Sequence, residues 1–212
     1  MATLGVLVAG GAGSRLALGI PKALVRLGGV TLLDRGLAIL AAVCDDIVVT
    51  APVGIALPLP ELARSPRGAC AVRRADDPLG TAGPLAGMVA GLTSVAFERA
   101  IVLGVDLPFI EPAGLAVLLE RISGRLAVVP APGGFPQPLA AAYAPEASAK
   151  LALRLAAGER SPTRALGALD ALLLDDRDLA RLPGGLESFF NLNSPADLEA
   201  AERRLAMRQA SA

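Results

Sequence analysis

The chain has 212 residues, enough for one domain with a sizeable core, and it combines 53% hydrophobic with only 3% aromatic residues, so aliphatic side chains must form that core. Its 20 basic and 20 acidic residues give a formal net charge of zero, which argues against the broad basic surface of a nucleic-acid-binding protein and favours a small-molecule ligand. The absence of histidine excludes Ser-His-Asp hydrolysis, histidine general-base catalysis and His-ligated zinc.

Short aliphatic runs alternate with helical patterns over most of the chain. The runs predict strands at residues 4–9, 47–51, 70–73, 100–104 and 126–130. The helical patterns predict helices at residues 30–43, 84–95 and 112–122. Such alternation is typical of a parallel sheet with right-handed crossovers. We therefore predict an α/β fold, a three-layer α/β/α sandwich with a mostly parallel, Rossmann-like sheet.

The last third of the chain follows a different pattern. Residues 132–136 predict a turn, residues 137–143 an antiparallel strand at the sheet edge, and residues 145–156 a helix. A last helix is predicted to have Ser194 as its N-cap, Pro195 at its first position and Asp197 at its third, and to reach about Met207. We expect a single domain over residues 1–208.

Cysteine usage and the first residues bear on the cellular environment. Cys44 and Cys70 lie in apolar stretches without a second Cys or His at metal-site spacing, so we interpret both as reduced core residues. Residues 1–8 carry no charged leader, and the apolar run breaks at Gly10 before it is long enough to cross a membrane. We expect a cytoplasmic protein with no membrane or nucleic-acid partner.

A glycine-rich loop follows the first predicted strand, where Val8 and Ala9 lead into Gly10, Gly11 and Gly13. Such a loop leaves backbone N–H groups free to bind an anion, and glycine permits both close approach and positive φ. The alternative is an ordinary turn between a strand and a helix.

The spacing around this loop rules out two common phosphate-binding loops. A Walker loop needs Gly-Lys-Ser/Thr, but Lys22 follows Pro21. A dinucleotide-binding loop needs Gly or Ala where Leu16 stands and an acidic residue where Thr50 stands. What remains is Gly-Gly-x-Gly-x-Arg, ending in Arg15, and a stiff Pro-Lys turn that directs Lys22 back towards the loop.

This segment resembles the signature loop of nucleotidyltransferases, in particular the molybdenum cofactor guanylyltransferases of the MobA type. The resemblance continues in the same order at residues 83–87 (Gly-Pro-Leu-Ala-Gly), 104–109 (Gly-Val-Asp-Leu-Pro-Phe), 137–139 (Gln-Pro-Leu) and 190–198 (Phe-Asn-Leu-Asn-Ser-Pro-Ala-Asp-Leu). The first loop and Asp106 are shared by many nucleotidyltransferases, whereas residues 83–87 and 190–198 are narrower and point to the molybdopterin branch. The family usually has an aspartate where Pro21 stands, and Pro-Lys is common in cytidylyl- and sugar-phosphate-specific relatives.

The resemblance implies three groups of functional residues. The catalytic residues would be Arg15, Lys22 and Asp106. The nucleotide-binding residues would be Val8, Ala9, Gly10, Gly11, Gly13, Lys22, Thr50, Asp77, Gly83 and Asp106. The acceptor-binding residues would be Gly87, Arg160, Arg164, Asn191 and Asn193.

Asp106 would also hold Mg²⁺, the expected cofactor. It follows a predicted strand, so its carboxylate should lie at the carboxyl edge of the sheet, where α/β enzymes gather their ligands. The alternative is an N-cap for the helix that follows Pro112. Asp76 and Asp77 precede Gly83, where the family has a guanine- or ribose-side aspartate; spacing favours Asp77, and the alternative is a solvated loop pair.

The acceptor residues have structural alternatives as well. Arg160 and Arg164 resemble a basic stretch near the pterin phosphate but can instead begin a solvated helix. Asn191 and Asn193 alternate along an extended segment, so both amides would face one side. Asn193 can instead support the turn before Ser194.

The resemblance implies transfer of GMP from GTP to molybdenum-molybdopterin with release of pyrophosphate. Residues of about 1–110 would form the nucleotide-binding half and about 111–208 the acceptor-binding half. Expected protein partners are molybdenum cofactor insertion proteins or target molybdoenzymes, and the expected state is a monomer or weak oligomer. Three alternatives stay open: cytidylyl transfer to molybdopterin, nucleotidyl transfer to a sugar phosphate, and a non-catalytic nucleotide or pterin carrier.

Overall fold

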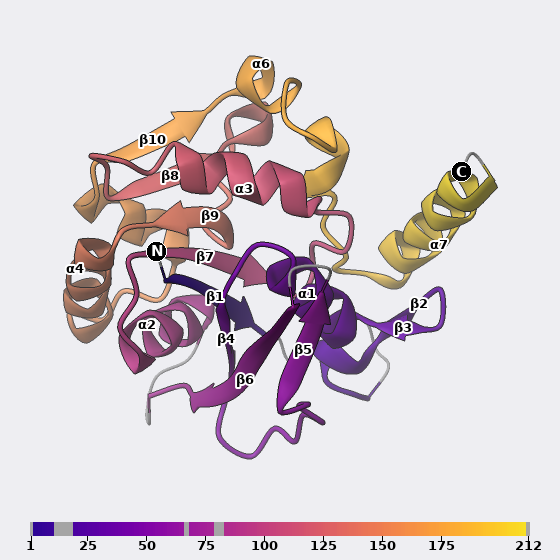
Figure 1. The fold of residues 1–212 in the computed structure, drawn as a ribbon, viewed down its shortest axis with the longest axis horizontal. Coiled ribbons are helices and arrows are strands. Elements are labelled where there is room, and N and C mark those ends of the chain that lie inside the picture. Colours follow the sequence, from indigo (N-terminus) through magenta and orange to yellow (C-terminus); the bar gives the residue numbers. More distant parts are fainter. Residues whose placement is uncertain (1, 11–18, 66–67, 79–82, 211–212) are drawn as a thin grey trace.

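The computed structural model describes residues 2–10, 19–65, 68–78 and 83–210, and its centre is an eight-stranded sheet (Figure 1). The strands follow the order β10-β8-β9-β7-β1-β4-β6-β5. In chain order they are β1 (Thr3–Val8), β4 (Asp46–Ala51), β5 (Leu62–Ser65), β6 (Gly68–Asp76), β7 (Arg99–Gly104), β8 (Ala127–Pro130), β9 (Ala140–Tyr143) and β10 (Ala171–Leu174). β5 and β9 run against the other strands, so the sheet is mixed but mostly parallel.

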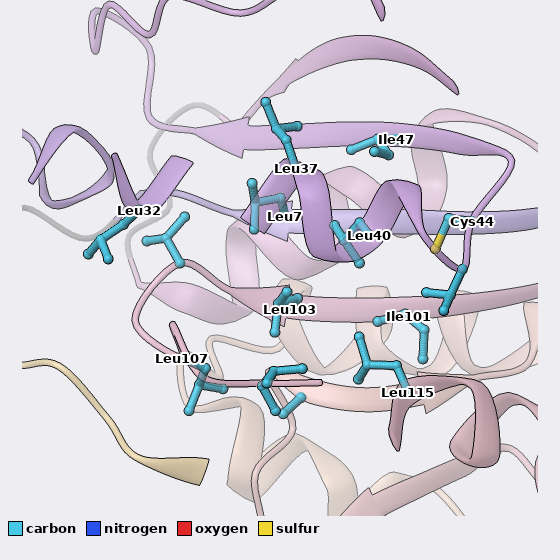
Figure 2. Packing of buried hydrophobic residues seen from close by; sticks show 14 of the residues in the cluster. Leu7, Leu32, Leu37, Leu40, Cys44, Ile47, Ile101, Leu103, Leu107 and Leu115 are labelled. Atoms are coloured by element: carbon cyan, nitrogen blue, oxygen red, sulfur yellow. The ribbon is translucent and has the colours of Figure 1, made fainter. Parts of the chain in front are cut away.

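Helices cover both faces of the sheet, because each central strand is apolar on both sides. On β1, Leu7 faces one hydrophobic cluster while Leu4 and Val6 face the other, as the alternation of strand side chains requires. α1 (Leu32–Ala41) and α3 (Pro112–Glu120) pack on the Leu7 side, where Figure 2 shows their leucines against the sheet. α2 (Pro84–Ser94) and α4 (Pro145–Ala156) cover the opposite face.

Shorter elements surround this sandwich. They are η2 (Lys22–Leu24), the hairpin of β2 (Arg26–Leu27) and β3 (Val30–Thr31), η3 (Pro132–Gly134), α5 (Pro162–Ala165), η4 (Leu166–Ala168), α6 (Asp176–Leu179) and η5 (Gly185–Phe189). α7 (Pro195–Ala210) extends from the body beside the hairpin (Figure 1), where Glu202 accepts a hydrogen bond from the Gly28 N–H at 2.9 Å. Within the described part of the chain no helix is long and apolar enough to cross a membrane.

The structure confirms the α/β sandwich, and the five strands and the helices predicted from the sequence are all present. One placement was wrong: the antiparallel strand within residues 137–143 lies inside the sheet, between β7 and β8, rather than at its edge. All four side chains of β9 are buried, and its alanines are small enough to be covered on both faces. The antiparallel edge strand is instead β5, which follows a proline-rich stretch and pairs with β6.

The first predicted helix also begins later than expected. Residues 30 and 31 form β3, and Thr31 then caps α1 by accepting a hydrogen bond from the Asp34 N–H at 3.0 Å. Cys44 and Cys70 are buried as predicted. The Cys70 sulfur lies 3.3 Å from the Cys44 carbonyl oxygen, which ties β6 to the end of α1.

Candidate active site

The carboxyl ends of four neighbouring parallel strands meet at one edge of the sheet. Val8 on β1 is paired in register with Thr50 on β4 and with Gly104 on β7. Thr50 is in turn paired with Ala75 on β6. The chain leaves β1 towards β4 and leaves β7 towards β8, so β1 and β7 flank a topological switch point, where open α/β sheets bind ligands. Asp77 follows β6 and Asp106 follows β7, and the three strand spacings between them span roughly 14 Å.

Two buried polar oxygens lie at the β4–β6 side of this edge. Thr50 Oγ1 and Asp77 Oδ1 have no hydrogen-bond partner within the described part of the chain. Gly87, in the first turn of α2, comes so close that a Cβ there would lie 2.8 Å from the Thr50 oxygen and 3.1 Å from the Asp77 oxygen. A Cβ on Gly10 would lie 2.9 Å from Pro52 Cδ and 3.4 Å from the other Asp77 oxygen. Glycines at both positions therefore allow α2 and residue 10 to pack directly against the Thr50 and Asp77 side chains.

Asp77, and not its neighbour, is the inward-facing member of the acidic pair. Asp76 is exposed and forms an ion pair with Arg74 at 2.7 Å, whereas Asp77 is only 9% exposed. Burial raises the pKa of Asp77, the nearby Asp76 carboxylate raises it further, and Arg74 works in the opposite direction. A buried carboxylate with a raised pKa and an unpaired oxygen is suited to accept hydrogen bonds from a ligand.

Lys22 lies at the β7 side of the same edge. Pro21, with φ of −53°, sets the start of η2, and Lys22 is then only 8% exposed. Its Nζ donates to Asp106 Oδ2 at 3.1 Å and to Asn193 Oδ1 at 2.7 Å. The stiff turn therefore delivers the lysine to the expected metal carboxylate, whereas the loop residues 11–18, towards which the sequence directs it, lie outside the described residues.

Asp106 is held by a backbone hydrogen bond and by close packing against Gly104. Its carbonyl oxygen accepts from the Leu192 N–H at 2.9 Å, which ties it to the C-terminal segment. A Cβ on Gly104 would lie 2.6 Å from Asp106 Oδ1, so only glycine leaves room for this carboxylate conformation. The N-cap of α3 is Glu111, so Asp106 does not cap that helix and the structural alternative for it is wrong.

A basic turn packs against the N-terminus of α2. Gly83, with φ of +97°, caps the helix, and a Cβ there would lie 3.3 Å from the Arg160 carbonyl oxygen. The Arg160 guanidinium donates to the carbonyl oxygens of Leu155 at 3.0 Å and Glu159 at 2.9 Å. Arg164 binds the Glu159 carboxylate through Nε and Nη2, both at 2.9 Å. Hydrogen bonds from Arg164 and the backbone lower the pKa of Glu159 to about 2.

The C-terminal segment places the two asparagines differently. Asn193 reaches Lys22, while Asn191 Nδ2 lies 3.5 Å from the Phe189 carbonyl oxygen. Asp197 Oδ2 accepts from the Asn193 and Ser194 N–H groups at 2.9 and 2.8 Å, and Ser194 Oγ accepts from the Asp197 N–H at 3.2 Å. This reciprocal cap confirms the predicted start of α7. Asn193 supports the turn with its backbone and reaches the site with its side chain.

Comparison with known proteins assigns this arrangement to a family. The profile of the MobA-like NTP transferase domain matches residues 5–172. The chain belongs to the MobA-like NTP transferases. It is therefore a nucleotidyltransferase, and the sequence-based assignment to this family is confirmed.

Individual relatives agree with the family. The chain is 34% identical to a probable molybdenum cofactor guanylyltransferase from Natronomonas pharaonis, over 95% of this chain and 97% of that protein. It is 31% identical to a molybdenum cofactor guanylyltransferase from Desulfosudis oleivorans, over 95% of each. The fold matches that of molybdopterin-guanine dinucleotide biosynthesis protein A from Archaeoglobus fulgidus, with a TM-score of 0.71, 24% identity and coverage of 96% and 99% of the two chains.

The fold of this MobA-like transferase brings most of the predicted residues to one edge. The residues that lie at this edge are Val8, Ala9, Gly10, Lys22, Thr50, Asp77, Gly87, Asp106 and Asn193. Gly87 lies against the expected nucleotide residues, and Gly83 against the expected acceptor residue Arg160. Gly11, Gly13 and Arg15 fall outside the described residues.

Two site neighbours were not predicted from the sequence. Glu159 organises the basic turn, and its position directly before Arg160 was the available signal. Asp197 was predicted only as part of a helix start, yet it also fixes the backbone of Asn193.

Proposed function

We propose that this enzyme transfers GMP from GTP to molybdenum-molybdopterin, releasing pyrophosphate and forming the guanine dinucleotide form of the molybdenum cofactor. The observation that carries the proposal is the row of groups along the sheet edge. Buried acceptors lie over β4 and β6, the glycine-rich loop follows β1, and a Lys–Asp pair lies over β7. The activity for which these relatives are named favours guanylyl transfer to the molybdenum cofactor.

The nucleotide would lie along this edge. The loop amides of Gly10, Gly11 and Gly13, with Arg15, would bind the triphosphate, and Val8 and Ala9 would support the start of the loop. Thr50 and Asp77 would face the nucleoside, and Gly83 would start the helix behind it. The guanine edge carries an N–H and an amino group side by side. A carboxylate such as that of Asp77 can accept a hydrogen bond from each of them. This match supports guanine over cytosine, whose edge pairs a donor with an acceptor.

Asp106 would hold the divalent cation, which we propose to be Mg²⁺. A carboxylate is the ligand that Mg²⁺ prefers, and this one is partly exposed, with a side-chain exposure of 27%. No cluster of three or more His, Cys, Asp or Glu side chains suited to a metal occurs among residues 2–10, 19–65, 68–78 and 83–210. This agrees with the usual binding of Mg²⁺ by one or two carboxylates together with substrate phosphates. The cation would neutralise charge on the phosphates.

The reaction needs positioning and charge neutralisation more than proton transfer. The terminal phosphate of the pterin has a second pKa of about 6, so it is mostly ionised at neutral pH. Its oxygen would form a bond to the α-phosphorus of GTP while the bond from that phosphorus to the bridging oxygen breaks, and pyrophosphate leaves with the electron pair. Lys22 would offer its ammonium group to the triphosphate, and no histidine is needed as a base.

The acceptor would approach from the C-terminal part. Arg160, Arg164, Asn191 and Asn193 are the proposed contacts, with Gly87 keeping the helix N-terminus close to the nucleotide. The bidentate pairing of Arg164 with Glu159 keeps this guanidinium oriented before the pterin phosphate arrives. We further propose one domain over residues 1–208, in which residues of about 1–110 bind the nucleotide and about 111–208 the acceptor.

Alanine variants of the Lys–Asp pair test the proposal. Asp106→Ala and Lys22→Ala should fold but form almost no dinucleotide from GTP and the pterin, as measured by chromatography of the product. Asp170→Ala and Lys150→Ala remove the same groups from exposed positions and serve as matched controls. Full product formation in either site variant would remove the basis of the proposal.

Cytidylyl transfer is the second candidate. It is favoured by the Pro21–Lys22 pair, which is common in cytidylyl-specific relatives. Higher pyrophosphate release with CTP than with GTP, in the presence of molybdopterin, would select this candidate.

A further inference from the structure

The contact between Lys22 and Asn193 joins the two ends of the chain at the candidate site. Lys22 Nζ lies 2.7 Å from Asn193 Oδ1 and 3.1 Å from Asp106 Oδ2. The two residues in the shorter contact are 171 positions apart in the sequence. The lysine belongs to the proposed nucleotide side, whereas the resemblance to the family assigned the asparagine to the acceptor.

The geometry fixes which way the Asn193 amide faces. A lysine ammonium has only donors, so the group facing it must be the amide oxygen. The Nδ2 group has no acceptor among the residues that the structure describes, so it can donate to another group, such as an anionic oxygen. One side chain can in this way orient the lysine and still meet the second substrate.

Backbone contacts hold Asn193 in this position. The Leu192 N–H donates to the Asp106 carbonyl oxygen at 2.9 Å, directly before the asparagine. The Asn193 and Ser194 N–H groups both donate to Asp197 Oδ2, at 2.9 and 2.8 Å. These hydrogen bonds lower the pKa of Asp197, the one from Asn193 contributing most, so the carboxylate is ionised and binds the turn firmly.

A neutral acceptor suits this position better than a carboxylate. Lys22 forms an ion pair with Asp106, and the Asp197 carboxylate also interacts with it electrostatically, so a further carboxylate at position 193 would compete with phosphate oxygens for the ammonium group. An amide oxygen orients the lysine without adding negative charge beside the triphosphate.

We propose that Asn193 is a positioning residue for nucleotide binding: it holds the Lys22 ammonium at the Asp106 edge, where the triphosphate arrives. The inference rests on the proposed function for the identity of the ligand. It differs from an acceptor-binding role because its effect is present when no acceptor is bound.

Equilibrium binding of a triphosphate without the pterin tests this inference. The probes are GTP and CTP, each with Mg²⁺, measured by calorimetry on the full chain. Asn193→Ala should weaken binding of the preferred triphosphate about tenfold, the size expected for a hydrogen bond to a charged group. Asn193→Asp should weaken it at least as much, because its carboxylate adds negative charge beside the phosphates. Gln209→Ala is the matched comparison, because it removes an amide from an exposed position of α7, and it should bind as the wild type does.

A double-mutant cycle separates positioning from a direct contact with the nucleotide. Lys22→Met should weaken binding by itself, and adding Asn193→Ala to it should cause no further loss, because the asparagine would act only through the lysine. Asn193 is an exposed residue, so its alanine variant should keep the wild-type urea midpoint, which shows that folding is intact.

Two results would overturn the inference while leaving the proposed function standing. Wild-type triphosphate affinity in Asn193→Ala, with only the acceptor KM raised, would make the residue an acceptor contact and leave the proposed function standing. A further loss on top of Lys22→Met would mean that Asn193 acts independently of the lysine. If the wild type binds neither triphosphate, the proposed function fails together with the inference.

Discussion

Replacing Asp77 by asparagine should stabilise the ligand-free protein while weakening nucleotide binding. The Asp77 carboxylate is buried and one of its oxygens is unpaired within the described residues. Its pKa is raised, so in the folded state the charged form is disfavoured. Asparagine removes the charge but keeps the shape. An unsatisfied buried polar group costs about 1–3 kcal/mol, and we expect a gain of about 1 kcal/mol at pH 7.

The pH dependence of this gain follows from the direction of the pKa shift. Because the folded pKa is raised above the unfolded value of about 3.9, the folded state binds more protons between the two values, and stability falls as pH rises through that range. The advantage of Asp77→Asn should therefore be complete above the raised folded pKa, shrink as pH falls from that value towards about 3.9, and be absent at lower pH.

Thermal unfolding at several pH values measures the effect. A gain of 1 kcal/mol corresponds to a rise in Tm of roughly 2–4 °C for a chain of this length. Asp76→Asn is the matched control, since that carboxylate is exposed and paired with Arg74, and it should change stability by less than about 0.5 kcal/mol. A lower Tm for Asp77→Asn at pH 7 would show that the charged carboxylate does not destabilise the fold, and unchanged GTP affinity would show that Asp77 does not contact the nucleotide.

Three further perturbations probe other parts of the structure. Tyr143→Phe removes the buried hydroxyl that donates to the Pro138 carbonyl at 2.8 Å and should cost about 1–2 kcal/mol in urea unfolding; no loss would mean that the bond adds nothing. Glu159→Gln should lower the free energy of unfolding by an amount that is constant from about pH 5 to 8 and disappears as pH falls towards about 2. The reason is that Arg164 is the main group that lowers the Glu159 pKa to about 2. A difference in stability that does not change with pH would argue against this. Gly87→Ala places a methyl group against Thr50 Oγ1 and Asp77 Oδ1 and should weaken GTP binding. The net change in stability should be no more than about 2 kcal/mol, because the higher helix propensity of alanine offsets part of the clash. Unchanged GTP affinity in calorimetry would contradict this prediction.

The parts of the fold that follow from local pattern were predictable. Strands such as β1 and β7 are short, continuous aliphatic runs, and the Ser-Pro-x-Asp start of α7 is readable because its side chains satisfy the N–H groups beside them. The order of strands is not a local property. The central position of β9 depends on pairing with β7 on one side and β8 on the other, which no stretch of its own sequence records.

The candidate site shows the same division. Asp106 and Thr50 were placed at the carboxyl edge because each ends a recognisable strand. Spacing favoured Asp77 over Asp76, but the burial of Asp77 depends on the packing of Gly87 and α2 against β4 and β6, which the sequence does not record. The Lys22–Asn193 contact spans 171 positions, and neither side chain alone indicates the other.

Guanylyl transfer to molybdopterin is tested most directly by identifying the product with each triphosphate. The enzyme would be incubated with Mg²⁺, molybdenum-molybdopterin and either GTP or CTP, with pyrophosphate and the pterin dinucleotide measured together. We expect one pyrophosphate for each guanine dinucleotide formed and little product with CTP. A cytosine dinucleotide as the main product, or tight GTP binding with no pyrophosphate released in the presence of the pterin, would contradict guanylyl transfer.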